Sequence, residues 1–164
     1  MGECIYYDVK PHIFKRLLKE GRDPNTCEEP RNPLLVTATC FRRHRIASFL
    51  LESGAEPNLP EEGVTPALMI AGYYGHINIL EKLVAYGVDI NQRDDNGENA
   101  LFYAIAWSAP LPVFKWLVEH GIDLNVRTKK EGLSVPQWLR GPDAPDYNPC
   151  NEVDKYLVSC GAKL

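Results

Sequence analysis

Four histidines are the side chains of this sequence best suited to acid–base or metal chemistry: His12, His44, His76 and His120. By pattern, none of them has a serine or cysteine partner, so no pair of nucleophile and base is predicted. The carboxylates between Asp94 and Glu98 come closest to a cation loop, but the ligand spacing and the terminal bidentate glutamate of a calcium loop are missing. We therefore expect no catalytic residue, no metal site and no cofactor, and we interpret residues 94–98 as a turn.

Five cysteines are spread along the chain: Cys4, Cys27, Cys40, Cys150 and Cys160. No two of them have the two-residue spacing of zinc ligands, so reduced thiols are favoured, with a disulfide between Cys150 and Cys160 as the alternative. Glu3 and Asp8 precede the first lysine, so the N-terminus lacks the basic start of a secretory signal. We expect a cytoplasmic protein, or one secreted by a route that leaves no visible signal.

The composition is that of a single soluble domain: 164 residues, of which 45% are hydrophobic and 24% are charged. The longest uncharged apolar run, Ala100 to Phe114, contains two prolines and is shorter than the roughly 20 residues that cross a bilayer. We expect it to be packed inside the protein and predict no membrane contact. A net charge of -4 argues against a nucleic-acid surface, which needs concentrated lysine and arginine.

A nine-residue phrase that runs from leucine to asparagine recurs along the chain. Its copies are Leu17 to Asn25, Leu50 to Asn58, Leu83 to Asn91 and Leu117 to Asn125. The glycines inside the copies lie 33, 33 and 34 residues apart, and a shortened fifth copy, Leu157 to Gly161, follows after 40 residues. A nearly constant interval of this length indicates one supersecondary unit per repeat.

Each phrase is expected to end a helix. The apolar residues before the phrase glycine recur at a helical spacing that makes one buried face, as Ile79, Leu80 and Leu83 do. The glycine then closes the helix in a left-handed conformation, where a Cβ would clash.

A shorter partner helix is expected ahead of each of these helices, at Leu34 to Phe41, Ala67 to Tyr74 and Leu101 to Trp107. The partner helices are expected to begin after capping residues that carry a side-chain oxygen: Asn32, Thr65 and Asn99. The turns that follow lie 10 residues after these caps, at Arg42, Gly75 and Ala109.

The repeat resembles that of the ankyrin family, whose unit is a β-turn followed by two antiparallel helices. The resemblance rests on Gly63-Val64-Thr65-Pro66, on Gly75-His76 and on Gly87 to Asn91, and it extends over nearly all of the chain. It implies an all-α solenoid of about five helix-turn-helix repeats joined by β-turn fingers, with degenerate caps at both ends. The histidine of the family's opening motif is absent. The interval from cap to turn is one residue longer than usual, so each first helix or its turn is expected to be one residue longer.

We expect one ankyrin-repeat domain over residues 1–164. Its approximate repeats are 1–25, 26–58, 59–91, 92–125 and 126–164. Residues 141–149 contain three prolines and are interpreted as an extended surface insertion, which explains the longer interval before the last phrase.

In ankyrin proteins the first helices and the turn tips line a concave binding face, so the resemblance places the binding surface there. The first-helix residues expected to contact a partner are Met69, Tyr73, Tyr74, Tyr103 and Trp107. The four aromatic residues among them come from adjacent repeats and are predicted to form one patch, since tyrosine and tryptophan favour interface hot spots. The alternative is that one or more of them pack between repeats.

Two acidic residues occupy the same place in three successive turns: Glu28 and Glu29, Glu61 and Glu62, and Asp94 and Asp95. In stacked repeats they are expected to form an acidic ridge that steers a partner with a basic surface. The alternative is that they only keep the turns soluble.

Arg42, Arg43 and Arg45 form a cluster of the opposite charge at the start of one outer helix. Without a further basic track, they favour a solvated face or a self-contact over nucleic-acid binding.

The repeats account for the whole chain, so its function is expected to be carried by its surface. We expect a non-catalytic module that binds another protein and inhibits or masks it, of the inhibitor, immunity or defence-blocking type. The alternative is an accessory or assembly subunit that does not inhibit its partner. No small-molecule substrate is expected, and a monomer is favoured.

Overall fold

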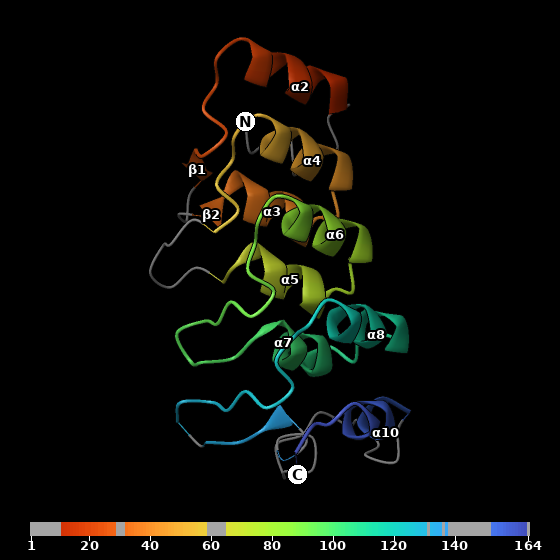
Figure 1. Cartoon of the computed structure of the whole chain (residues 1–164). Coiled ribbons are helices and arrows are strands. Elements are labelled where there is room, and N and C mark those ends of the chain that lie inside the picture. Colours follow the sequence, from red (N-terminus) through yellow and green to blue (C-terminus); the bar gives the residue numbers. More distant parts are fainter. Residues whose placement is uncertain are drawn as a thin grey trace. The chain divides into compact units, whose positions relative to one another are not determined.

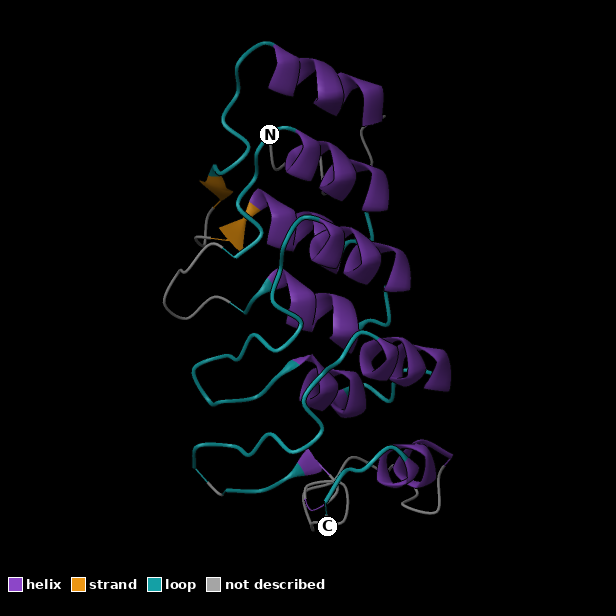
Figure 2. Ribbon diagram, viewed as in Figure 1, coloured by secondary structure: helices purple, strands orange, loops and turns teal. Residues whose placement is uncertain are grey.

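Helices form nearly all of the regular structure in the described part of the chain (Figure 2). The computed structural model describes residues 11–28, 32–58, 65–130, 132–135, 137 and 152–163. Their contacts divide the chain into two compact units, Met1–Ala71 with Asn78–Val88 and Gly72–Ile77 with Asp89–Leu164. The predicted all-α repeat fold is confirmed, while the insertion predicted at 141–149 lies outside the described residues. The assignment of residues 1–164 to one domain stays a prediction.

The first unit contains α2 (Pro11–Lys19), α3 (Leu34–Cys40), α4 (His44–Glu52) and most of α5 (Ala67–Tyr73) and α6 (Ile77–Ala85) (Figure 1). Both α2 and α3 pack against α4. The helical spacing of apolar residues places Phe14, Ile46 and Leu50 in the interior, each at most 2% exposed. A short antiparallel ribbon joins β1 (Cys27–Glu28) to β2 (Asn32–Pro33).

The second unit contains α7 (Ala100–Ala106), α8 (Leu111–Glu119) and α10 (Glu152–Ser159). Helix α8 packs against both α7 and α10. Leu101, Phe114 and Leu157 are fully buried, as expected from the same apolar spacing.

The phrase glycines end the helices as predicted. Gly21, Gly54, Gly87, Gly121 and Gly161 all have positive φ angles, between 82° and 102°. In each phrase the N–H of the residue after the glycine donates to the carbonyl of the leucine five residues earlier, as Ala55 does to Leu50 at 2.9 Å and Ile122 to Leu117 at 3.1 Å. This hydrogen bond explains why leucine and glycine recur together.

Of the three predicted caps, Asn99 is confirmed, Asn32 is wrong, and Thr65 lies two residues before the start of α5. The Asn99 side chain accepts a hydrogen bond from the Leu101 N–H at 3.1 Å and caps α7. Helix α3 begins only at Leu34, with Pro33 in the capping position and no side-chain hydrogen bond there. Asn32 is one residue too early to cap α3, because Asn32 and Pro33 form strand β2.

The first helices correct the predicted alignment of the repeats. Helices α3, α5 and α7 each have seven residues and begin 33 residues apart. The residue in the left-handed conformation lies eight positions after each start, and these residues are Arg42, Gly75 and Ser108. Helices α3 and α5 begin two residues after the expected caps Asn32 and Thr65, whereas α7 begins one residue after Asn99. The expected lengthening of each first helix or its turn relative to the family stays a prediction.

Two of these three left-handed residues are not glycines. Arg42 has a φ of 53° and Ser108 a φ of 52°, in a region that costs an L-residue with a Cβ about 1–2 kcal/mol. The turn from α7 to α8 is also one residue longer than the other two, since it runs from Trp107 to Pro110. This single extra residue accounts for the interval of 34 between Gly87 and Gly121.

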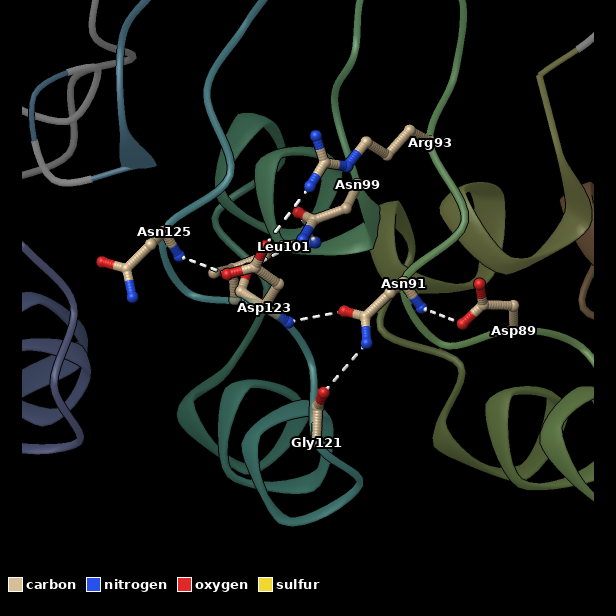
Figure 3. Close-up of polar contacts among 8 residues, drawn as sticks. All are labelled: Asp89, Asn91, Arg93, Asn99, Leu101, Gly121, Asp123 and Asn125. Carbon is tan, nitrogen blue, oxygen red and sulfur yellow. Dashed lines mark hydrogen bonds and ion pairs between the residues drawn. The ribbon is translucent and has the colours of Figure 1, made fainter.

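In three of the four complete phrases, the final asparagine joins neighbouring repeats within a unit, as Figure 3 shows for Asn91. The Asn91 side chain accepts from the Asp123 N–H at 2.6 Å and donates to the Gly121 carbonyl at 3.1 Å. Asn25 repeats this pattern with Glu56 and Gly54, and Asn125 accepts from the Lys163 N–H at 3.0 Å. We call these contacts the asparagine clamps. Their signal in the sequence is the constant position of asparagine four residues after the phrase glycine.

Candidate interaction surface

Three aromatic side chains and a histidine lie together in the second unit, and we call them the aromatic cluster: Tyr73, Tyr74, His76 and Trp107. The Tyr73 and Trp107 rings stack with centroids 5.0 Å apart and planes inclined by 26°. Tyr74 meets Tyr73 edge-on at 4.9 Å and stacks on His76 at 5.5 Å. Trp107 is 59% exposed and Tyr74 is 42% exposed. The cluster therefore combines fixed ring contacts with a large accessible aromatic area.

The position of the cluster follows from the ends of two first helices. Tyr73 is the last residue of α5, while Tyr74 and Trp107 are the first residues after α5 and α7. The end of α5 approaches the start of α7 closely, because a Cβ on Gly72 would lie only 2.9 Å from the Ala100 carbonyl oxygen. A glycine at position 72 therefore allows the backbones of α5 and α7 to approach each other. Tyr73, the next residue, stacks on Trp107.

The two chain segments that carry the cluster contain no Asp, Glu, Lys or Arg. These segments run from Ala67 to Leu80 and from Asn99 to Phe114. Little charge in these two segments must therefore be desolvated when another surface covers the rings.

A second set of contacts fixes the finger before α7. The Tyr103 hydroxyl donates to the Asp94 carboxylate at 3.0 Å. Asp94 also accepts from the N–H groups of Asn96 and Glu98, at 2.9 Å and 2.8 Å. Asp94 therefore holds its turn together and ties it to the first helix, whereas Asp95 beside it is exposed. Residues 94–98 form the turn that the sequence predicted.

A family model described as ankyrin repeats in three copies matches residues 3–94 and 62–128, which together cover most of the chain. The chain belongs to the ankyrin-repeat family. A search of curated proteins finds no match to it. Ankyrin repeats act by presenting an extended surface to other proteins, so the ankyrin-repeat chain is a protein–protein interaction module of a generally non-catalytic kind.

Three of the four residues of the predicted aromatic patch lie in contact in the ankyrin-repeat chain. Tyr73, Tyr74 and Trp107 contact one another, and the hydrogen bond from Tyr103 to Asp94 links two residues that the sequence assigned to different features. His76 also belongs to the cluster, a contact that its position in the glycine-histidine motif does not predict. Sequence patterns do not show these contacts, because each depends on how one helix is rotated against the next.

The prediction that Met69 faces a partner is corrected. Its side chain is fully buried, like that of Leu68 beside it. The reason is that a seven-residue first helix buries more than one face, and an unbranched methionine fills the space there as a core side chain.

Only part of the predicted acidic ridge falls within the described residues. Glu29, Glu61 and Glu62 lie outside them, as does the side chain of Glu28. Asp94 and Asp95 are described, and only Asp95 presents an exposed carboxylate. The ridge stays a prediction, with Asp94 assigned to the structure of its turn.

The described thiols are free. Cys160 is exposed and Cys40 is half-buried. Burial raises the pKa of the Cys40 thiol above its usual value, and a hydrogen bond with its own backbone offsets this only in part. Cys40 is therefore a protonated thiol at neutral pH. Cys4 and Cys150 lie outside the described residues.

Among the described residues, no group of three or more His, Cys, Asp or Glu side chains is placed to hold a metal ion. Within the same part of the chain, no helix has the length and apolar character needed to cross a membrane.

Proposed function

We propose that this ankyrin-repeat chain binds one partner protein through the aromatic cluster and thereby masks or inhibits it. The observation that carries the proposal is the exposure of Trp107, 59% accessible although its ring is stacked on Tyr73. Tryptophan and tyrosine dominate interface hot spots, because each buries a large area and has few torsions to freeze. A ring that is already held in place by its neighbours loses still less freedom when a partner covers it.

The expected acidic ridge would attract a partner whose surface is basic. Asp95 is exposed at one finger, and the acids of the other fingers occupy the same place in the sequence. A basic surface on the partner would then be steered toward the fingers during association. We place the protein in the cytoplasm, in keeping with the free thiols of Cys40 and Cys160, and as a monomer until it meets this partner.

The second candidate function is an accessory or assembly subunit. The same aromatic cluster would then dock the chain onto a complex without lowering the activity of the protein it contacts. The two functions differ in their effect on the partner, so an activity measurement separates them.

The test captures the partner on immobilised chain and then measures what binding does to it. The comparison uses wild type, a Tyr74→Ala/Trp107→Ala variant, and Tyr86→Ala as a matched control. Tyr86 is 43% exposed but belongs to the other unit. We expect a protein that wild type and the control retain and the cluster variant loses, and we expect its activity to fall at one-to-one occupancy. Unchanged activity of the bound protein would support the accessory function. Equal capture of that protein by wild type and by the cluster variant would contradict both functions.

A further inference from the structure

The turn between α3 and α4 and the first two residues of α4 together form a cationic segment in the first unit, which we call the arginine turn: Phe41, Arg42, Arg43, His44 and Arg45. Phe41 is 44% exposed, and the side chains of Arg42, His44 and Arg45 are exposed as well. The turn thus presents an apolar ring beside two accessible guanidinium groups.

No acidic residue lies close to the arginine turn in the sequence. The sequence contains no Asp or Glu from Pro30 to Leu51. Within the described part of the chain, Arg42 and Arg45 form no ion pair. The first turn of α4 also lacks an acidic residue, so the positive end of its helix dipole adds to the charge of the arginines.

The fold does not require this charge. The corresponding turns after α5 and α7 adopt the same left-handed conformation with Gly75 and Ser108, and neither turn contains Asp, Glu, Lys or Arg. Arg42 instead occupies that conformation at a cost in stability, and Arg45 places a cation at the unfavourable end of a helix. Residues that destabilise a fold that forms without them indicate a role outside folding.

We propose that the arginine turn docks an acidic segment of a partner protein. Carboxylates of the segment would accept hydrogen bonds from the planar guanidinium groups of Arg42 and Arg45, which suit paired oxygens. An apolar side chain of the same segment would pack on Phe41. The inference presupposes only that the chain binds a protein, and not that the aromatic cluster is its anchor.

Charge complementarity favours a protein segment over a nucleic acid as the occupant. The arginines of the arginine turn lie within four consecutive residues, Arg42 to Arg45. A nucleic acid needs cations that follow its line of phosphates. The chain as a whole carries a net charge of -4, which repels a polyanion. A short acidic segment has few charges to place and needs only a small cationic surface.

The test measures fluorescence anisotropy with a labelled peptide of alternating glutamate and leucine. We expect wild type to bind this peptide, and Arg42→Gly/Arg45→Ala to bind it at least about tenfold more weakly, with added salt weakening wild-type binding as well. The matched control is Ser108→Gly, which relieves the same backbone strain in the other unit and should leave peptide binding unchanged. Arg42→Gly alone should raise Tm by roughly 2–4 °C, because it removes the backbone strain. A raised Tm would show that weaker peptide binding does not result from unfolding.

Two further probes separate the alternatives. A peptide with lysine in place of glutamate should not bind, and a single-stranded oligonucleotide should bind more weakly than the acidic peptide. The Tyr74→Ala/Trp107→Ala variant should keep full affinity for the acidic peptide, so failure of the aromatic anchor would leave this result intact. Absence of wild-type binding, equal binding by the arginine variant, or preference for the oligonucleotide would each overturn the proposal.

Discussion

Replacement of Asn91 by alanine should lower the free energy of unfolding by about 1–3 kcal/mol. The amide of Asn91 bonds to the Asp123 N–H and the Gly121 carbonyl, so its removal leaves both backbone groups without this partner. The loss also weakens the boundary between two successive repeats, which stabilise one another mainly through this boundary. Chemical denaturation followed by circular dichroism measures the change.

Asn58 supplies a matched control for Asn91. It ends the second phrase just as Asn91 ends the third, yet within the described residues its side chain forms no hydrogen bond. Asn58→Ala should therefore change stability by less than about 0.5 kcal/mol. Equal losses from the two substitutions would show that the clamp geometry does not stabilise the repeat boundary.

Removal of two rings from the aromatic cluster should abolish most partner binding. We expect Tyr74→Ala/Trp107→Ala to weaken the affinity for the captured partner by about 2–4 kcal/mol, which is roughly 30-fold to 1,000-fold. Both side chains are exposed, so the variant should keep the circular dichroism spectrum of wild type. Isothermal titration of the purified partner gives the affinity.

Tyr103 is deliberately left intact in that variant. Its hydroxyl bonds to Asp94 and fixes the finger, so truncation of Tyr103 would alter the turn together with the rings. A folded Tyr74→Ala/Trp107→Ala variant with wild-type affinity would remove the cluster from the binding surface. Loss of the helical spectrum would instead show that these rings belong to the core.

Local rules predicted the framework of this protein. Gly54 and Gly87 end their helices because the left-handed conformation and the hydrogen bond back to leucine are properties of one turn of chain. The periodic apolar residues likewise place Leu50 and Leu83 in the interior, because a helix presents one face every three or four residues.

Which residues form the candidate surface depends on contacts between distant parts of the chain, and local rules do not include such contacts. The packing around α5 decides that Met69 is buried, while Tyr74, the first residue after the helix, is exposed. The cap expected from Asn32 is lost because β2 pairs with a strand from the preceding segment. The bond between Tyr103 and Asp94 joins residues nine positions apart, and no periodic pattern predicts such a contact.

Amide hydrogen exchange of the chain with its captured partner bound tests the central claim most directly. If the aromatic cluster is the binding surface, the amides of the turns that follow α5 and α7, from Tyr73 to His76 and from Ala106 to Ala109, should become protected in the complex. Protection confined to the fingers, at residues 92–98 and 126–130, with no change at Tyr74 and Trp107, would contradict the account.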